Sequence, residues 1–283
     1  MNNACETYPF SDLTLARRLE KAEALASVDF VNGRVRAFPD RGAEWTQFAG
    51  TYAMFDGPRS PVTQTFALGM FQPVTSADLN ELETFFLNRG AEVFHEICPL
   101  ADSSALALLN ERGYQPVEFT SVLYRPIRVD VCLSTVHNQL IKVRRTGSDE
   151  HELWARTAAE GWNEFGEFTD FMHELGVMNA KRSSLSFLAE LDGKAIATGA
   201  MSICDGVALL AGASTIPEGR RQGAQLALLE FRLRHAAEQG CDIALMGALP
   251  GSASQRNAER NGFRIAYTRT KWHLPQRTKL AGG

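Results

Sequence analysis

The two halves of the chain end in the same pattern, and this repeat is the feature that most constrains the fold. Asn110-Glu111-Arg112-Gly113-Tyr114 corresponds to Glu259-Arg260-Asn261-Gly262-Phe263 at an offset of 149 residues, and Pro126 corresponds to Pro275 at the same offset. Both endings follow the order helix, glycine, strand, helix, glycine-aromatic pair and strand. The identities are few, so coincidence is the alternative. Duplication of one unit explains the shared order better.

Length and element pattern agree with a duplicated chain. A chain of 283 residues suits two domains of about 140 residues each. Segments with helical or strand-like spacing alternate in both halves: helices over 11–28, 76–89, 149–161 and 222–239, and strands within 34–71, 92–97, 117–127, 140–145, 185–203, 207–216 and 242–248. Residues 128–138 have no clear pattern, which predicts domains over 1–132 and 133–283.

Composition narrows the classes of function. The net charge of −4, from 29 basic and 33 acidic residues, gives no reason to expect a nucleic acid partner. Five widely spaced cysteines, with no metal-ligand spacing, predict reduced thiols and no metal site. The sequence shows neither a secretory signal nor an apolar run long enough to span a membrane. We therefore expect a cytoplasmic protein with no membrane partner. A homodimer is possible.

One loop carries the strongest chemical signal. The apolar strand 207–216 runs into Pro-Glu-Gly-Arg-Arg-Gln-Gly-Ala-Gln, which opens the long helix 222–239. A helix that begins at a glycine turn leaves backbone N–H groups without partners, and its dipole favours an anion there. Gly223 permits close approach of a ligand, while Arg220 and Arg221 can bind phosphate oxygens. The alternative is a strand-to-helix turn with exposed arginines and no ligand.

This loop resembles the coenzyme A loop of the GCN5-related N-acetyltransferase (GNAT) superfamily. The family pattern is Arg/Gln-x-x-Gly-x-Gly/Ala, and Arg220-Arg221-Gln222-Gly223-Ala224-Gln225 matches it except at Gln225. The resemblance covers roughly 138–275, and covers 10–127 only by topology and the shared ending. It implies an α/β (α+β) fold with two GNAT-like domains, each a mixed, mostly antiparallel sheet flanked by helices. The C-terminal domain would be the acetyltransferase and the N-terminal domain a degenerate copy.

The resemblance also implies the donor and its site. The co-substrate would be acetyl-coenzyme A (acetyl-CoA), with its pantetheine arm paired to a splayed strand and its pyrophosphate held by the loop. The implied coenzyme-binding residues are Ala213, Ser214, Thr215, Arg220, Arg221, Gln222, Gly223, Ala224, Gln225, Ser254 and Asn257. For Ser254 the alternative is helix capping, and for Asn257 a solvated polar face.

The N-terminal copy lacks this loop. Its corresponding segment, 71–78, has neither the arginine nor the glycine, and it places Asp78 where an anion would otherwise sit. We therefore expect one coenzyme site per chain. The segment 59–65 before it is either a loop beside a substrate cleft or a long hairpin turn.

Catalytic residues are not assigned by the sequence. The tyrosine that protonates the leaving thiolate in many family members would align with Ala258, and Tyr267 has the wrong spacing. Candidate bases are Glu164, Glu167 and Glu190, each with an exposed acidic loop as its alternative. His151 and His173 are interpreted as helix-surface residues.

Three functions fit these residues. The first is transfer of an acetyl group from acetyl-CoA to an amine of a small molecule or peptide. The second is a non-catalytic acyl-CoA sensor or interaction module, which the missing tyrosine favours. The third is an acyl or aminoacyl transferase that does not use coenzyme A.

Overall fold

The computed structural model describes residues 7–128, 138–147, 149–162, 174, 177–178 and 181–275. The N-terminal half contains α1 (Leu13–Ala37), β1 (Glu44–Phe48), β2 (Thr51–Phe55), β3 (Gln64–Phe66), α2 (Ser76–Leu87), β4 (Phe94–Ile97), α3 (Ser103–Glu111) and β5 (Gln115–Pro126). The C-terminal half contains β6 (Ile141–Arg145), α4 (His151–Trp162), β7 (Leu185–Leu191), β8 (Lys194–Cys204), β9 (Val207–Thr215), α6 (Ala224–Glu238), β10 (Ile243–Ala248), α7 (Ala253–Arg260) and β11 (Arg264–His273). The predicted alternation of helices and strands is confirmed.

All described strands form one sheet, in the order β1-β2-β3-β4-β11-β5-β10-β9-β8-β7-β6. The final strand of each half crosses into the other half, because β11 pairs with β4 and β5 pairs with β10. The two exchanged strands also pair with each other along most of their length. The prediction of two domains, each with its own sheet, is therefore corrected: the mixed sheet with flanking helices is present, but it is a single 11-stranded sheet. Strand exchange at the centre replaces two sheet edges with paired backbone.

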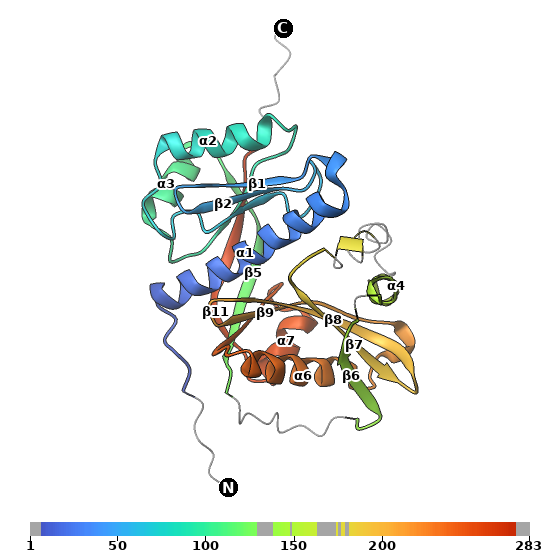
Figure 1. Cartoon of the computed structure of the whole chain (residues 1–283). Coiled ribbons are helices and arrows are strands. Elements are labelled where there is room, and N and C mark those ends of the chain that lie inside the picture. Colours follow the sequence, from blue (N-terminus) through green and yellow to red (C-terminus); the bar gives the residue numbers. More distant parts are fainter. Residues whose placement is uncertain are drawn as a thin grey trace.

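Helices cover both faces of this sheet. Alternate residues of β2 point to opposite faces of the sheet. Tyr52 and Met54 pack with α1, whereas Ala53 and Phe55 pack with α2 and α3. In the C-terminal half α6 packs on the same side as α2 and α3, while α4 shares the side of α1. Figure 1 shows α2 and α3 at the top, α6 and α7 at the bottom, and α1 running diagonally between them.

Helix α1 joins the two halves. Its N-cap Asp12 accepts a hydrogen bond from Leu15 N, and its 25 residues extend beyond the predicted end at residue 28. Its buried face, which includes Leu19, packs against residues of β2, β3, β9, β10 and β11 in one core cluster. At Gly33 the Arg182 side chain occupies the space that a Cβ would take. One element of the N-terminal half therefore covers strands of the C-terminal half.

The part of the chain that the structure describes contains no helix that is both long and apolar enough to cross a membrane.

Candidate functional site

Strands β9 and β10 separate where the predicted coenzyme site begins. They pair in parallel from Val207↔Ile243 to Leu209↔Leu245, and no pairing joins them beyond that point. Among the described strands, the remainder of β9 pairs only with β8. Ala213 lies in this part of β9 and is exposed. The diverging strands form the splay that the family resemblance implies.

A β-bulge shapes this part of β9. The β8–β9 register changes between Thr198↔Ser214 and Ala200↔Ala211, so β9 has one more residue than β8 in this interval. Gly212 has a φ of 59°, a left-handed conformation that glycine adopts without strain. Thr198 Oγ1 donates to the Gly212 carbonyl at 3.1 Å. A bulge bends its strand and increases the local twist, which moves β9 away from β10.

Two side chains hold the bulge from opposite sides of the sheet. Trp154 of α4 donates from Nε1 to the Gly199 carbonyl at 3.3 Å. Arg232 of α6 donates from Nη1 to the carbonyls of Ala200 and Ala211 at 3.1 and 3.2 Å. Arg232 is buried, which lowers its pKa to about 10, and among the described residues no carboxylate forms an ion pair with it. Its charge is therefore directed at the backbone around the bulge.

The predicted phosphate loop follows β9 directly. A 3-10 turn, Pro217–Gly219, leads to Arg221 with φ 62° and Gly223 with φ 90°. Helix α6 begins at Ala224, and no side chain caps it. The first N–H groups of an α-helix have no intrahelical partners, and they lie at the positive end of the dipole. The uncapped N-terminus of α6 therefore follows the splayed strand after the short loop 216–223.

The polar side chains of the loop are exposed. Arg220, Arg221 and Gln222 all lie at the surface. Arg220 Nη2 donates to the Gly161 carbonyl at the end of α4, at 3.4 Å. The loop therefore combines exposed positive charge with an uncapped helix.

Gln225 adopts a position that the sequence did not indicate. Its Nε2 donates to the Ser214 carbonyl at 2.8 Å and to Thr215 Oγ1 at 2.9 Å, so the side chain turns back onto the end of β9. Ser214 Oγ in turn donates to the Ala158 carbonyl at 2.9 Å. The close approach of α4 requires Gly161, because a Cβ there would collide with Ser214 Oγ. Ser214 is therefore already engaged through its side chain and its carbonyl oxygen.

Helix α7 follows β10, the other diverging strand. Ser252 caps it by accepting from Gln255 N at 3.1 Å, so the capping role belongs to Ser252 rather than Ser254. Ser254 and Asn257 are exposed, and the Asn257 carbonyl accepts from Asn261 Nδ2 at 2.7 Å. The two residues lie on the helix after β10, as the loop lies after β9.

The candidate catalytic residues have structural roles or lie outside the residues that the structure describes. Ala258 is buried in the core, and Tyr267 donates its hydroxyl to Glu20 at 2.8 Å beneath α1. Glu190 accepts two hydrogen bonds from Arg144 on β6, at 3.0 and 2.7 Å. Glu164, Glu167 and His173 lie outside the described residues. His151 is the first residue of α4, and no group of three metal-ligating side chains occurs among the described residues.

Comparison with known proteins gives one family match. Residues 149–263 match the family model described as the acetyltransferase (GNAT) family. This match lies within the C-terminal half of the chain. GNAT is a family of acyltransferases that use acetyl-CoA. No curated protein matches the chain in sequence.

Solved structures share the fold of the whole chain. A GCN5-related N-acetyltransferase from Kribbella flavida has a TM-score of 0.63 at 19% identity, over 92% of this chain and 96% of that one. A tandem GNAT protein from the clavulanic acid biosynthesis pathway has a TM-score of 0.57 at 13% identity, over 93% and 97%. A GNAT-family acetyltransferase from Colwellia psychrerythraea has a TM-score of 0.51 at 16% identity, over 95% and 97%. At these identities the likeness concerns the fold, and it extends over both halves of this chain.

Proposed function

We propose that the protein is an N-acetyltransferase that moves an acetyl group from acetyl-CoA to an amine of a small molecule or peptide. The main observation in support of this proposal is the N-terminus of α6, which begins after Gly223 and has no side-chain cap. It follows the part of β9 that has separated from β10. Unpaired helix donors suit a pyrophosphate, and the free edge of β9 suits a pantetheine arm. The GNAT match over 149–263 supplies the independent support.

In this proposal the coenzyme contacts come from three places. The edge of β9 supplies Ala213, Ser214 and Thr215; the loop supplies 220–225; and α7 supplies Ser254 and Asn257. The bond between Gln225 Nε2 and the Ser214 carbonyl refines the assignment, because a ligand has to pair with other groups of β9 or displace that side chain. The exposed backbone around Ala213 is the better partner.

The reaction joins the acceptor nitrogen to the acetyl carbonyl carbon and breaks the carbon–sulfur bond. An alkylammonium, with a pKa of about 10.4, first loses one proton to become a nucleophile. After attack, a second proton leaves the nitrogen and one proton ends on the sulfur of coenzyme A. Backbone N–H groups at the bulge are suited to stabilise the oxyanion. We assign no residue to the proton transfers.

We also propose that 1–132 and 133–283 are two copies of one GNAT-like unit, of which only the second binds coenzyme A. The N-terminal copy then acts as a structural partner, through the exchanged strand β5 and through α1.

A non-catalytic acyl-CoA sensor is the second candidate. The position of the family tyrosine is the buried Ala258, and the hydroxyl of Tyr267 is bonded to Glu20. A thiol-release assay with amines decides between the two functions. Tight acetyl-CoA binding without turnover of any amine favours the sensor.

The experiment for the donor site removes the loop charge. Arg220→Ala with Arg221→Ala is expected to weaken acetyl-CoA binding at least about tenfold, because charge-assisted hydrogen bonds to phosphate are lost. Calorimetry gives the affinity, and the thermal shift caused by acetyl-CoA gives a second readout. Arg59→Ala with Arg145→Ala removes two exposed arginines elsewhere and serves as the matched control. An affinity within twofold of wild type in the loop variant contradicts the assignment.

A further inference from the structure

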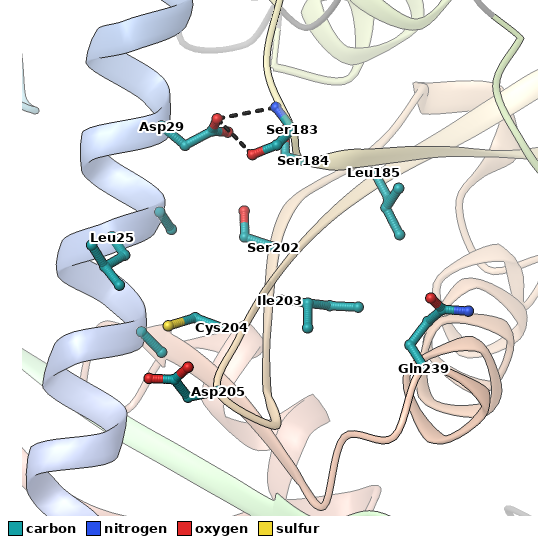
Figure 2. Close-up of a pocket in the computed structure, with 12 residues that line it drawn as sticks. Leu25, Asp29, Ser183, Ser184, Leu185, Ser202, Ile203, Cys204, Asp205 and Gln239 are labelled. Carbon is teal, nitrogen blue, oxygen red and sulfur yellow. Dashed lines mark hydrogen bonds between the residues drawn. The ribbon is translucent and has the colours of Figure 1, made fainter.

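Two neighbouring cavities with shared lining residues lie between α1 and the strands of the C-terminal half. The larger has a volume of about 570 Å³ and the smaller about 230 Å³, and Ala26, Ser184 and Ser202 line both. Figure 2 shows the larger cavity, with α1 on one side and the strand that carries Ser202 and Ile203 on the other. A space of this size suits a small organic molecule.

The smaller cavity reaches the β-bulge. Its wall includes Ala211 and Gly212 of β9 and Trp154 of α4, the same residues that form and support the bulge. Glu23 and Phe30 of α1 form the opposite wall. The cavity therefore connects the splayed strand, where the thioester would lie, with a helix of the N-terminal half.

Two charged side chains line the smaller cavity, and their surroundings differ. Arg182 faces Asp29, whose carboxylate accepts from Arg182 Nε at 3.3 Å and also from Ser183. Figure 2 shows Asp29 turned toward Ser183. Glu23, in contrast, shares one cation with a second carboxylate: Arg269 contacts Glu23 at 2.7 Å and Glu20 at 3.0 Å.

Carboxyl groups outnumber cationic side chains around Glu23. Glu20 and Glu96 are buried, and each has one carboxylate oxygen without a hydrogen-bond partner. Burial raises the pKa of both, and the charge of Glu23 contributes in the same direction. The cations that contact these three carboxyl groups are Arg269 and Lys271, and Lys271 also contacts Glu118 at 3.6 Å. A ligand that brings a positive charge to Glu23 would reduce this imbalance.

We propose that the smaller cavity is the acceptor site and that Glu23 binds the ammonium group of a small-molecule amine. The proposal rests on the acetyltransferase function above and adds the acceptor class and the residue that selects it. The body of the acceptor extends past Ala26 into the larger cavity, whose wall includes Leu25, Leu185 and Ile203. The N-terminal copy thus contributes a side chain to the acceptor site.

The test compares Glu23→Gln with wild type on two amine series: alkylamines such as 2-phenylethylamine and 1,4-diaminobutane, which are cations at pH 7.5, and arylamines such as 4-methoxyaniline, which are neutral. We expect Glu23→Gln to lower kcat/KM for the alkylamines about 10- to 100-fold, mainly through KM, because a charge-assisted hydrogen bond is lost. The arylamine values stay within twofold. Glu81→Gln, an exposed glutamate on α2, is the control and changes neither series.

The outcomes separate this proposal from the proposed function. If acetyl-CoA stabilises wild type and Glu23→Gln alike, while both amine series change equally or not at all, the acceptor assignment is overturned and the donor site stands. Wild type that binds acetyl-CoA but acetylates no alkylamine of the panel overturns it as well. If the wild-type protein does not bind acetyl-CoA, the proposed acetyltransferase function is overturned.

A second variant tests the cavity without altering charge. Ala26→Phe places a ring where the two cavities meet. We expect it to reduce kcat/KM for 2-phenylethylamine at least tenfold and to affect methylamine, which needs only the smaller cavity, much less. Equal effects on both amines contradict the proposed path of the acceptor.

Discussion

The N-termini of α2 and α6 occupy corresponding places in the two halves, and their chemistry is opposite. At α2, Thr75 Oγ1 accepts from Asp78 N at 3.2 Å, and Asp78 Oδ2 accepts from Thr75 N at 2.8 Å, which forms a capping box. At α6 the N-cap is Gly223, which provides no side-chain acceptor. The first helix satisfies free backbone donors at its start with the Thr75 and Asp78 side chains, whereas no side chain caps the second.

The two helices make the same kind of connection in both halves. Each helix connects two parallel strands, β3 to β4 through Thr65↔His95 and β9 to β10 through Val207↔Ile243. The difference therefore lies in a few residues at the start of each helix. A duplicated fold can lose a ligand site by capping one helix, with no change in strand order.

The largest expected effect comes from the residue that makes the α6 terminus accessible. Gly223→Val introduces a β-branched side chain at φ 90°, which costs about 1–2 kcal/mol in that conformation or forces the loop to change. A Cβ would meet its nearest neighbour only at 3.8 Å, so backbone conformation rather than crowding is decisive. We expect acetyl-CoA affinity to fall roughly 100-fold, or about 2.7 kcal/mol, measured by calorimetry.

Gly240→Val is the matched control for that change. Gly240 follows the other end of α6, has φ 79° and has open space around its Cα. It should lower stability by a similar amount while acetyl-CoA affinity stays within twofold. If both variants lose affinity equally, the effect is one of general destabilisation. The proposed difference between the N-termini of α2 and α6 in coenzyme binding would then be contradicted.

The local elements could be predicted from the sequence because their signals are local. The capping box joins Thr75 and Asp78, three residues apart, and the turn between β7 and β8 is formed by Asp192-Gly193, where both residues have positive φ. The exchange of β5 and β11 could not be predicted. Alternation along a strand indicates which face is buried but does not identify the neighbouring strand.

The residues that hold the β-bulge in β9 could not be predicted either, because their contacts are also long-range. Gly212 inside an apolar strand was the available signal for a bulge. Arg232 lies on a helix with an ordinary apolar pattern, and only the tertiary structure shows that it is buried against the Ala200 and Ala211 carbonyls. Glu23 also reaches its cavity through packing of α1 on strands far away in sequence. Long-range packing determines these roles, and no local pattern encodes them.

A smaller effect is expected when the chemistry of α2 is transferred to α6. Leu226 is the third residue of α6, as Asp78 is the third residue of α2. Leu226→Asp places a carboxylate beside the free donors, where it competes with phosphate and repels it. We expect acetyl-CoA affinity to fall about tenfold relative to Leu226→Asn, a neutral variant of similar size. Equal affinities in the two variants would show that phosphate does not lie at this terminus.

The smallest effect is expected at the cap of α2. Thr75→Ala removes the acceptor for Asp78 N and should lower the free energy of unfolding by about 1 kcal/mol, measured from the midpoint of urea denaturation. Thr75→Ser keeps the hydroxyl and should retain most of that stability. Acetyl-CoA affinity should be unchanged in both variants, because the donors at α2 serve the helix alone. A change in affinity in Thr75→Ala but not in Thr75→Ser would mean that the N-terminal copy communicates with the coenzyme site, and its helix terminus could no longer be treated as purely structural.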